Sequence, residues 1–286
     1  MTRNSFTGTM SGAALAVALS GCSGMQPAPV PAPVRSAAPA PMPAHPGNGT
    51  SVAVVAVPTV QAGTAAGHPD LSLLAPDARV TYRTLLKEGE GQVYALDPVR
   101  SDVRIYALRA GVGARFAHNH VLQVPHFSGL AFVPEKGLRG GSAQVAFRLA
   151  DLTLDDAAMR KATGGSFAPP LSAADIAGTR EHMLSEQNFQ AERFPQLVIS
   201  SVIEAGEQPV ASADVAITLH GETHHQRVLL KVHTGDGLLD VAGSLFLRQS
   251  DYGVKPYTVM GGLIGVDDLV GVEFSLHGAQ LRSWPE

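Results

Sequence analysis

Apolar and polar residues alternate along several short segments of the chain beyond Val93. The pattern is clearest in segments 143–149, 215–219, 228–232 and 270–276. Successive side chains of a β-strand point to opposite faces, so each segment predicts a strand with one apolar face. Turn sequences that contain glycine separate the segments. We therefore predict a mainly β fold in which about eight antiparallel strands close into a barrel, because closure removes exposed sheet edges.

A single helical insertion interrupts the predicted strands between Asp151 and Phe194. Within it, Ser172 stands three residues before Asp175, a spacing typical of a helix N-cap. Four of the following residues share one helical face: Ile176, Thr179, Met183 and Leu184. A shorter helix is predicted over 76–86, where a second set shares a face: Ala78, Tyr82, Leu85 and Leu86.

The first residues have the features of a secretory signal peptide with a lipobox. Arg3 precedes a small and apolar run that ends in Leu19-Ser20-Gly21-Cys22. This run of about ten residues is shorter than the ~20 that span a bilayer, and small residues precede Cys22 as a processing site requires. We predict that residues 1–21 are removed. An ordinary secretory signal with an incidental cysteine is the alternative.

The likeness to bacterial lipoprotein signals implies that Cys22 becomes the mature N-terminus and carries diacylglycerol and a further acyl chain such as palmitate. Such an anchor holds a protein on a membrane without crossing it. Ser23 stands where lipoproteins retained in the inner membrane have aspartate, so the outer membrane is the expected location. Residues 22–92, rich in proline, alanine and glycine, predict a flexible tether, and residues 93–286 form the predicted barrel domain.

Composition argues against a disulfide and against a nucleic-acid partner. Cys22 is the only cysteine, so the chain has no intramolecular disulfide and its core must hold by packing alone. The net charge is −4 and no basic cluster is present, which argues against a nucleic-acid partner.

Three segments of the last third carry a family resemblance. They are 189–195 with an aromatic-to-Phe-Pro corner, 215–221 with a Leu-x-Gly turn, and 241–253 with an Arg-x-Ser-Asp-aromatic-Gly strand end. Together they resemble the YceI-like family of periplasmic polyisoprenoid-binding proteins, over residues 93–282. The resemblance implies a lipocalin-like barrel on the periplasmic side of the cell envelope, with a lipid inside it.

His118 and His120 form the sharpest cluster among the 11 histidines. On a strand, both imidazoles share a face with Leu122 and Val124. They can then contact a ligand head group, hold a metal with a third ligand, or serve as structural histidines. We predict no metal, because two ligands do not close a zinc site. Some YceI-like members have a similar Gly-His-Asn-His sequence, and this chain has Ala117 in place of that glycine.

Arg248, Ser250 and Tyr252 end a predicted strand, with the first two on one face. In a barrel mouth they can bind a diphosphate or a quinone oxygen, because guanidinium offers a rigid fork of donors. The competing interpretation, which we favour, pairs Arg248 with Asp251 to hold the strand corner.

One face of each strand is expected to line the barrel. Candidate lining residues are Phe147, Phe246 or Leu247, and Phe274. The pattern does not say which face points inward, and an error of one residue in register reverses every assignment.

The chain lacks the motifs of acyl transfer, phosphate binding and zinc proteolysis, and its acid pairs, Asp155-Asp156 and Asp267-Asp268, are assigned to turns and solubility. We predict no enzymatic activity. The predicted function is a membrane-anchored binding protein for a polyisoprenoid or quinone-like amphiphile, with no other cofactor. The alternatives are a histidine-based metal protein or metal-dependent enzyme, an accessory of quinone redox chemistry with a membrane partner, and a carrier that sequesters toxic amphiphiles.

Overall fold

The computed structural model describes residues 69–285, which lie in one compact unit. The predicted signal peptide, Cys22 and most of the predicted tether fall outside these residues. Within them, no helix has the length and apolar character needed to cross a membrane. Helix α1 (Pro76–Glu88) and the first residues of β1 (Gly91–Leu96) precede Val93, so the folded residues begin before the predicted domain boundary.

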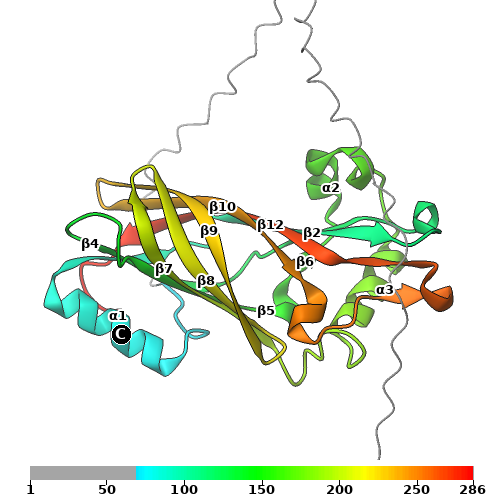
Figure 1. The fold of residues 1–286 in the computed structure, drawn as a ribbon, viewed down its shortest axis with the longest axis horizontal. Coiled ribbons are helices and arrows are strands. Elements are labelled where there is room, and N and C mark those ends of the chain that lie inside the picture. The colour runs from blue at the N-terminus through cyan, green and yellow to red at the C-terminus, as the bar shows by residue number, and fades with distance from the viewer. Residues whose placement is uncertain (1–68, 286) are drawn as a thin grey trace, which may run out of the picture. The chain divides into compact units, whose positions relative to one another are not determined.

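Eight antiparallel strands form a closed ring, which confirms the predicted barrel (Figure 1). Strand β1 closes this ring by pairing with β12, where Tyr94 lies opposite Gln280. In order around the ring, the strands are β1, β4 (Ser128–Pro134), β5 (Ser142–Arg148), β7 (Gln196–Glu207), β8 (Val210–Leu219), β9 (Glu222–Gly235), β10 (Leu238–Arg248) and β12 (Ile264–Gln280).

Strand β12 extends beyond the ring and carries additional strands. Its residues 278–280 pair with β1, whereas its residues 265–275 pair with β2 (Asp102–Ala110). Strand β3 (His120–Gln123) pairs with β2, the short β6 (Thr153–Leu154) pairs with β3, and β11 (Thr258–Val259) pairs with the start of β12. This extension, which the sequence did not predict, places His120 at one end of the barrel.

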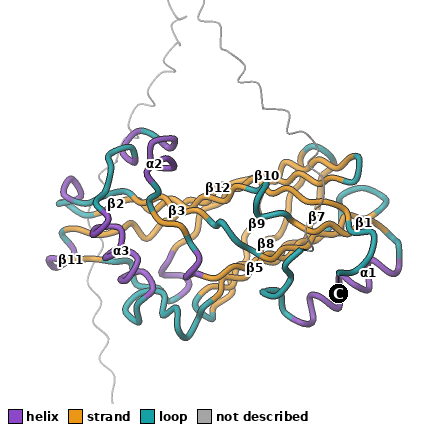
Figure 2. The backbone as a smooth tube through the Cα atoms, turned by 180° about the vertical axis from the view of Figure 1, so that it is seen from behind, coloured by secondary structure: helices purple, strands orange, loops and turns teal. Residues whose placement is uncertain are grey.

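Helices lie at both ends of the unit (Figure 2). Helix α1 lies at one end, and α2 (Ala157–Thr163) and α3 (Ala173–Leu184) lie at the other (Figure 1). The cap of α3 is confirmed, because Ser172 Oγ accepts a hydrogen bond from the Asp175 amide at 3.1 Å. Helix α2 was not predicted; it begins where Asp156 Oδ1 accepts a hydrogen bond from the Met159 amide at 3.0 Å.

Short 3-10 turns occur between the strands and helices. They are η1 (Ala114–Phe116), η2 (Leu149–Asp151), η3 (Gly165–Phe167), η4 (Gln249–Tyr252) and η5 (Met260–Gly262).

Apolar side chains gather on both faces of the barrel wall. The inner face holds the larger cluster, which includes Val145 and Phe147. On the outer face, Tyr82 of α1 packs in a second cluster with Val93 and Leu130. The predicted helix at 76–86 is thus confirmed, and it covers β1, β4 and β5. Burial raises the pKa of Tyr82 to about 12, although its hydroxyl lies 3.4 Å from Ser142 Oγ.

Candidate functional site

The barrel contains two cavities, of about 260 Å³ and about 110 Å³. We call the one of larger volume the wider cavity and the other the narrower cavity. Their walls come mainly from the inward side of the strands, and α3 adds Thr179 and Met183 to the wider one. Five residues line both cavities, so the two cavities adjoin. We call the part of the lumen that these five residues surround the waist. These residues are Val103, Phe147, Ile199, Leu245 and Val272.

Polar side chains are unevenly distributed between the two cavities. Among the described residues that line the narrower cavity, Ser201 is the single polar one. The wider cavity has more: His120, Thr179, His182, Asn188, Gln249 and Tyr257. The lumen therefore has a polar end near α3 and an apolar end, which suits an amphiphile with one polar head.

His120 reaches the wider cavity from the start of β3. Its Nδ1 lies 2.6 Å from Asp155 Oδ2. The imidazole is 13% exposed, and the Asp155 side chain is fully buried. Asp155 has a positive φ of 52° just after β6, and the Val121 amide donates to its Oδ1 at 3.0 Å. Asp155 thus orients the ring that lines the cavity.

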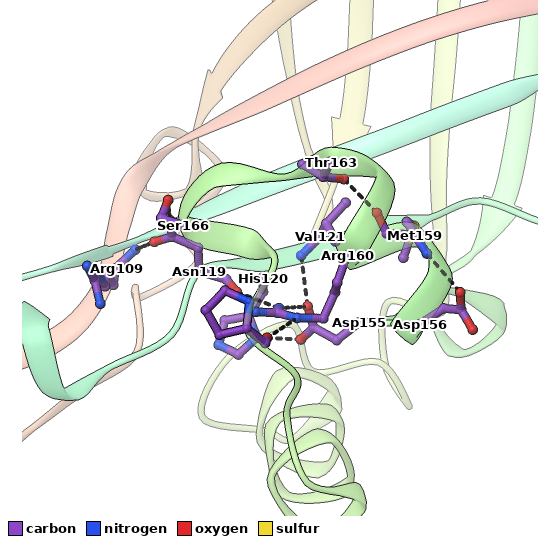
Figure 3. A network of polar contacts seen from close by, with 11 residues as sticks. Arg109, Asn119, His120, Val121, Asp155, Asp156, Met159, Arg160, Thr163 and Ser166 are labelled. Carbon is purple, nitrogen blue, oxygen red and sulfur yellow. Dashed lines mark hydrogen bonds and ion pairs between the residues drawn. The ribbon is translucent and has the colours of Figure 1, made fainter.

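Arg160 of α2 supplies the positive charge for this buried carboxylate (Figure 3). Its Nη1 lies 2.5 Å from Asp155 Oδ1 and donates to the Asn119 carbonyl at 2.8 Å, and its Nε donates to the Pro169 carbonyl at 3.0 Å. The Arg160 side chain is only 2% exposed. Because a buried charge is costly unless it is paired, these contacts account for both ions lying in the interior.

The charge state of Asp155 follows from competing effects. Burial alone would raise the pKa of its carboxyl group, but the hydrogen bonds from His120, the Val121 amide and Arg160 outweigh burial and lower that pKa below its ordinary value. Asp155 is therefore a carboxylate at neutral pH. The expected turn and solubility role for Asp155 is wrong, whereas its neighbour Asp156 does act locally as a helix cap.

His118 does not share the position of His120. Strand β3 begins at His120 and the preceding residues follow turn η1, so strand alternation does not extend back to His118. His118 is exposed and does not line either cavity. Asn119 is instead the buried neighbour: its Oδ1 accepts from the Arg109 amide at 3.0 Å, and its Nδ2 donates to Ser166 Oγ at 2.6 Å.

The structure decides which aromatic residues face inward. Phe147 lines both cavities and Phe274 lines the narrower one, whereas Phe246 is 63% exposed on the outer face. Leu247 and Leu245 of β10 point inward instead. The assignment of Phe246 as a lining residue is therefore wrong, and that of Leu247 is correct.

Arg248, Ser250 and Tyr252 do not form a head-group site in the lumen. Arg248 is 59% exposed and its Nη1 lies 3.7 Å from Asp268 Oδ2, so its partner is not Asp251. Ser250 donates its amide to Asp268 Oδ1 at 2.8 Å and its hydroxyl to Oδ2 at 2.7 Å. Tyr252 is buried, with its ring 4.9 Å from that of His224. The predicted pair of Arg248 with Asp251 is therefore wrong, because Arg248 and Ser250 both contact Asp268.

Two buried polar residues that line the wider cavity escaped the sequence interpretation. Asn188 follows α3, and its Nδ2 donates to the Lys255 carbonyl at 2.9 Å. Gln249 begins η4, and its Nε2 donates to the Asp267 carbonyl at 2.8 Å. Both side chains are buried. Gln249 is the variable residue of the Arg-x-Ser-Asp-aromatic-Gly strand end at 248–253. This motif was the one sequence feature that could have pointed to it.

His182 of α3 also lines the wider cavity, with its ring 4.1 Å from that of Tyr257. Within residues 69–285, no three His, Cys, Asp or Glu side chains lie close enough together to hold a metal ion.

A family model described as the YceI-like domain matches residues 94–277. No curated protein matches. Among solved structures, Burkholderia cenocepacia BcnA is 16% identical with a TM-score of 0.48, over 64% of this chain and 98% of that one. A polyisoprenoid binding domain from Saccharophagus degradans, implicated in plant cell wall breakdown, is 14% identical with a TM-score of 0.45, over 66% and 99%.

The YceI protein of Campylobacter jejuni is 11% identical with a TM-score of 0.41, over 56% of this chain and 84% of that one. Because the family model covers more than half of the sequence, the chain belongs to the YceI-like family.

Proposed function

We propose that this protein binds a polyisoprenoid or quinone-like amphiphile in the barrel lumen. The tail lies across the waist and in the narrower cavity, and the head lies in the wider cavity beside His120. The uneven distribution of polar lining residues is the observation that carries this proposal.

Typical free energies of burial and of hydrogen bonding assign different roles to the apolar and the polar end of the lumen. Burial of one CH₂ group contributes ~0.8 kcal/mol, so each five-carbon isoprenoid unit contributes ~3 to 4 kcal/mol before ordering costs. A neutral hydrogen bond contributes ~0.5 to 1.5 kcal/mol. The apolar walls therefore set affinity, and the polar residues near α3 set the choice of head group.

Two adjacent residues of β10 give a matched test. Leu245 lines both cavities, and its neighbour Phe246 is exposed on the outer face. We expect full-length wild-type protein and the Phe246→Trp variant to copurify with a stoichiometric amphiphile, identified by organic extraction and mass spectrometry. The Leu245→Trp variant should lose it, because an indole at the waist fills the lumen. Equal loss in both variants, or no amphiphile in any of the three, would contradict the proposal.

We further propose that lipidated Cys22 anchors the protein on the periplasmic face of the outer membrane, as its lipobox indicates. In fractionated cells, the wild-type chain should sediment with outer membranes and the Cys22→Ser variant should appear in the soluble fraction. Membrane association of Cys22→Ser would contradict the anchor without affecting the lumen proposal.

A further inference from the structure

Two amide side chains of the wider cavity already use their hydrogen-bond donors within the protein. The Nδ2 group of Asn188 donates to the Lys255 carbonyl at 2.9 Å, and the Nε2 group of Gln249 donates to the Asp267 carbonyl at 2.8 Å. A backbone carbonyl only accepts, so these contacts fix which end of each amide is nitrogen and which is oxygen. The amide oxygens of both residues are left as the ends that can meet a ligand.

His120 is also held by a contact within the protein. Its Nδ1 lies 2.6 Å from Asp155 Oδ2, and the other oxygen of that carboxylate is bound by Arg160. An ionised carboxylate only accepts, so Nδ1 carries a proton and donates it to Asp155. The geometry of the imidazole directs its Nε2 away from Asp155.

The two amide oxygens meet no donor within residues 69–285. No residue of that range donates a hydrogen bond to Asn188 Oδ1 or Gln249 Oε1, although both side chains line the cavity. Arg160, the nearby guanidinium, lines neither cavity. The remaining polar lining groups can either donate or accept, so they do not oppose this polarity. They are the hydroxyls of Thr179 and Tyr257 and the rings of His120 and His182.

We infer that the wider cavity selects a head group that donates hydrogen bonds, such as the hydroxyl of a polyisoprenoid alcohol or of a quinol. A head that only accepts, such as an ether or a quinone, leaves the two amide oxygens without partners. It also displaces water that would otherwise donate to them, which lowers affinity. This inference rests on the proposed function and specifies its ligand.

The test compares ligands in pairs, one with a hydroxyl donor and one without. Full-length protein, freed of lipid, is titrated with geranylgeraniol and with geranylgeranyl methyl ether, and separately with decylubiquinol and decylubiquinone. We expect the alcohol and the quinol to bind about ten-fold more tightly than their acceptor-only counterparts. The wild-type comparison needs no substitution, so it does not depend on how a variant folds.

A matched pair of variants localises the effect. Gln249→Met removes one acceptor from the cavity, and we expect it to reduce the ten-fold preference to about three-fold. Gln144→Met is the control, because Gln144 lies on β5, donates to Ser200 Oγ at 3.3 Å and lines neither cavity. The control should keep the wild-type preference.

Each outcome has a separate meaning. If both members of a pair bind and the acceptor-only ligand binds equally or more tightly, the inference is overturned and the proposed function stands. The same holds if Gln144→Met reduces the preference as much as Gln249→Met does. If none of the four ligands binds, the proposed function itself fails.

Discussion

The ring of Phe274 lies against the backbone of Gly243, its partner across the β10–β12 pair. A Cβ atom at residue 243 would lie 2.7 Å from Cζ of Phe274, which is closer than real contacts allow. The absence of a side chain at Gly243 therefore lets the Phe274 ring line the narrower cavity in its present position.

Gly243→Ala should accordingly displace the Phe274 ring into the narrower cavity. We expect a loss of about 1–3 kcal/mol in the free energy of unfolding, because overpacking forces side chains from their preferred positions. Affinity for a long isoprenoid should fall more than affinity for a short one. Urea unfolding and ligand titration measure the two effects. The control is Gly235→Ala, since a Cβ there meets nothing within 4 Å; comparable losses in both variants would refute the steric argument.

Asp155→Asn should destabilise the protein strongly. The substitution leaves the Arg160 guanidinium buried without its counter-charge, which costs about 3–5 kcal/mol in comparable sites. Asparagine tolerates the positive φ of this position, so the loss reports the charge and not the backbone. Asp214→Asn breaks the exposed pair with His225 and should cost under about 1 kcal/mol in the same urea titration. A small loss for Asp155→Asn would mean that the ion pair contributes little.

The contribution of Asp155 should depend on pH in a defined direction. Its pKa in the folded state lies below the ordinary value of 3.8, despite the opposing effect of burial. Such a group stabilises the fold fully above its unfolded pKa and loses that contribution as the pH falls through the folded pKa. The stability difference between wild type and Asp155→Asn should therefore shrink as the pH falls below about 4. A difference that persists unchanged to pH 2 would contradict this assignment.

Ser172→Ala should loosen the helix that borders the wider cavity. Ser172 caps α3, whose residues Thr179, His182 and Met183 line that cavity, and loss of a cap costs about 1 kcal/mol. Hydrogen exchange of the α3 amides should quicken, and ligand should dissociate faster. Thr84→Ala is the control, because that hydroxyl bonds only the Val80 carbonyl within α1. Unchanged α3 exchange in Ser172→Ala would show that packing alone fixes the helix.

Local sequence patterns predicted much of the fold. Alternation identified the strands around Val145 and Val228, and the Ser172–Asp175 spacing identified α3. The sequence did not show which side chains of β10 face the lumen. Leu245, Phe246 and Leu247 are all apolar, and such a run has no alternation. Only closure of the barrel decides that Phe246 is the outward residue.

The polar part of the site depended on contacts that sequence distance conceals. Arg248 was assigned to the nearby Asp251, but the β10–β12 register places Leu269 opposite Arg248 and so brings Asp268 within reach. Similarly, His120 and Asp155 meet because β3 pairs with β6 after a long excursion of the chain. A carboxylate in an acid pair is usually a solvated turn residue, so nothing local marked Asp155 as buried.

The pairing of β1 with residues 278–280 of β12 has a consequence for how the protein is made. During synthesis, the sheet has two unpaired edges until residues 278–280 are available, because these residues close the ring by pairing with β1. An incomplete chain thus exposes the apolar inner face of the sheet to other chains. Exposed apolar surface and unpaired strand edges favour aggregation. Binding by a chaperone should therefore matter most just before β12 pairs with β1.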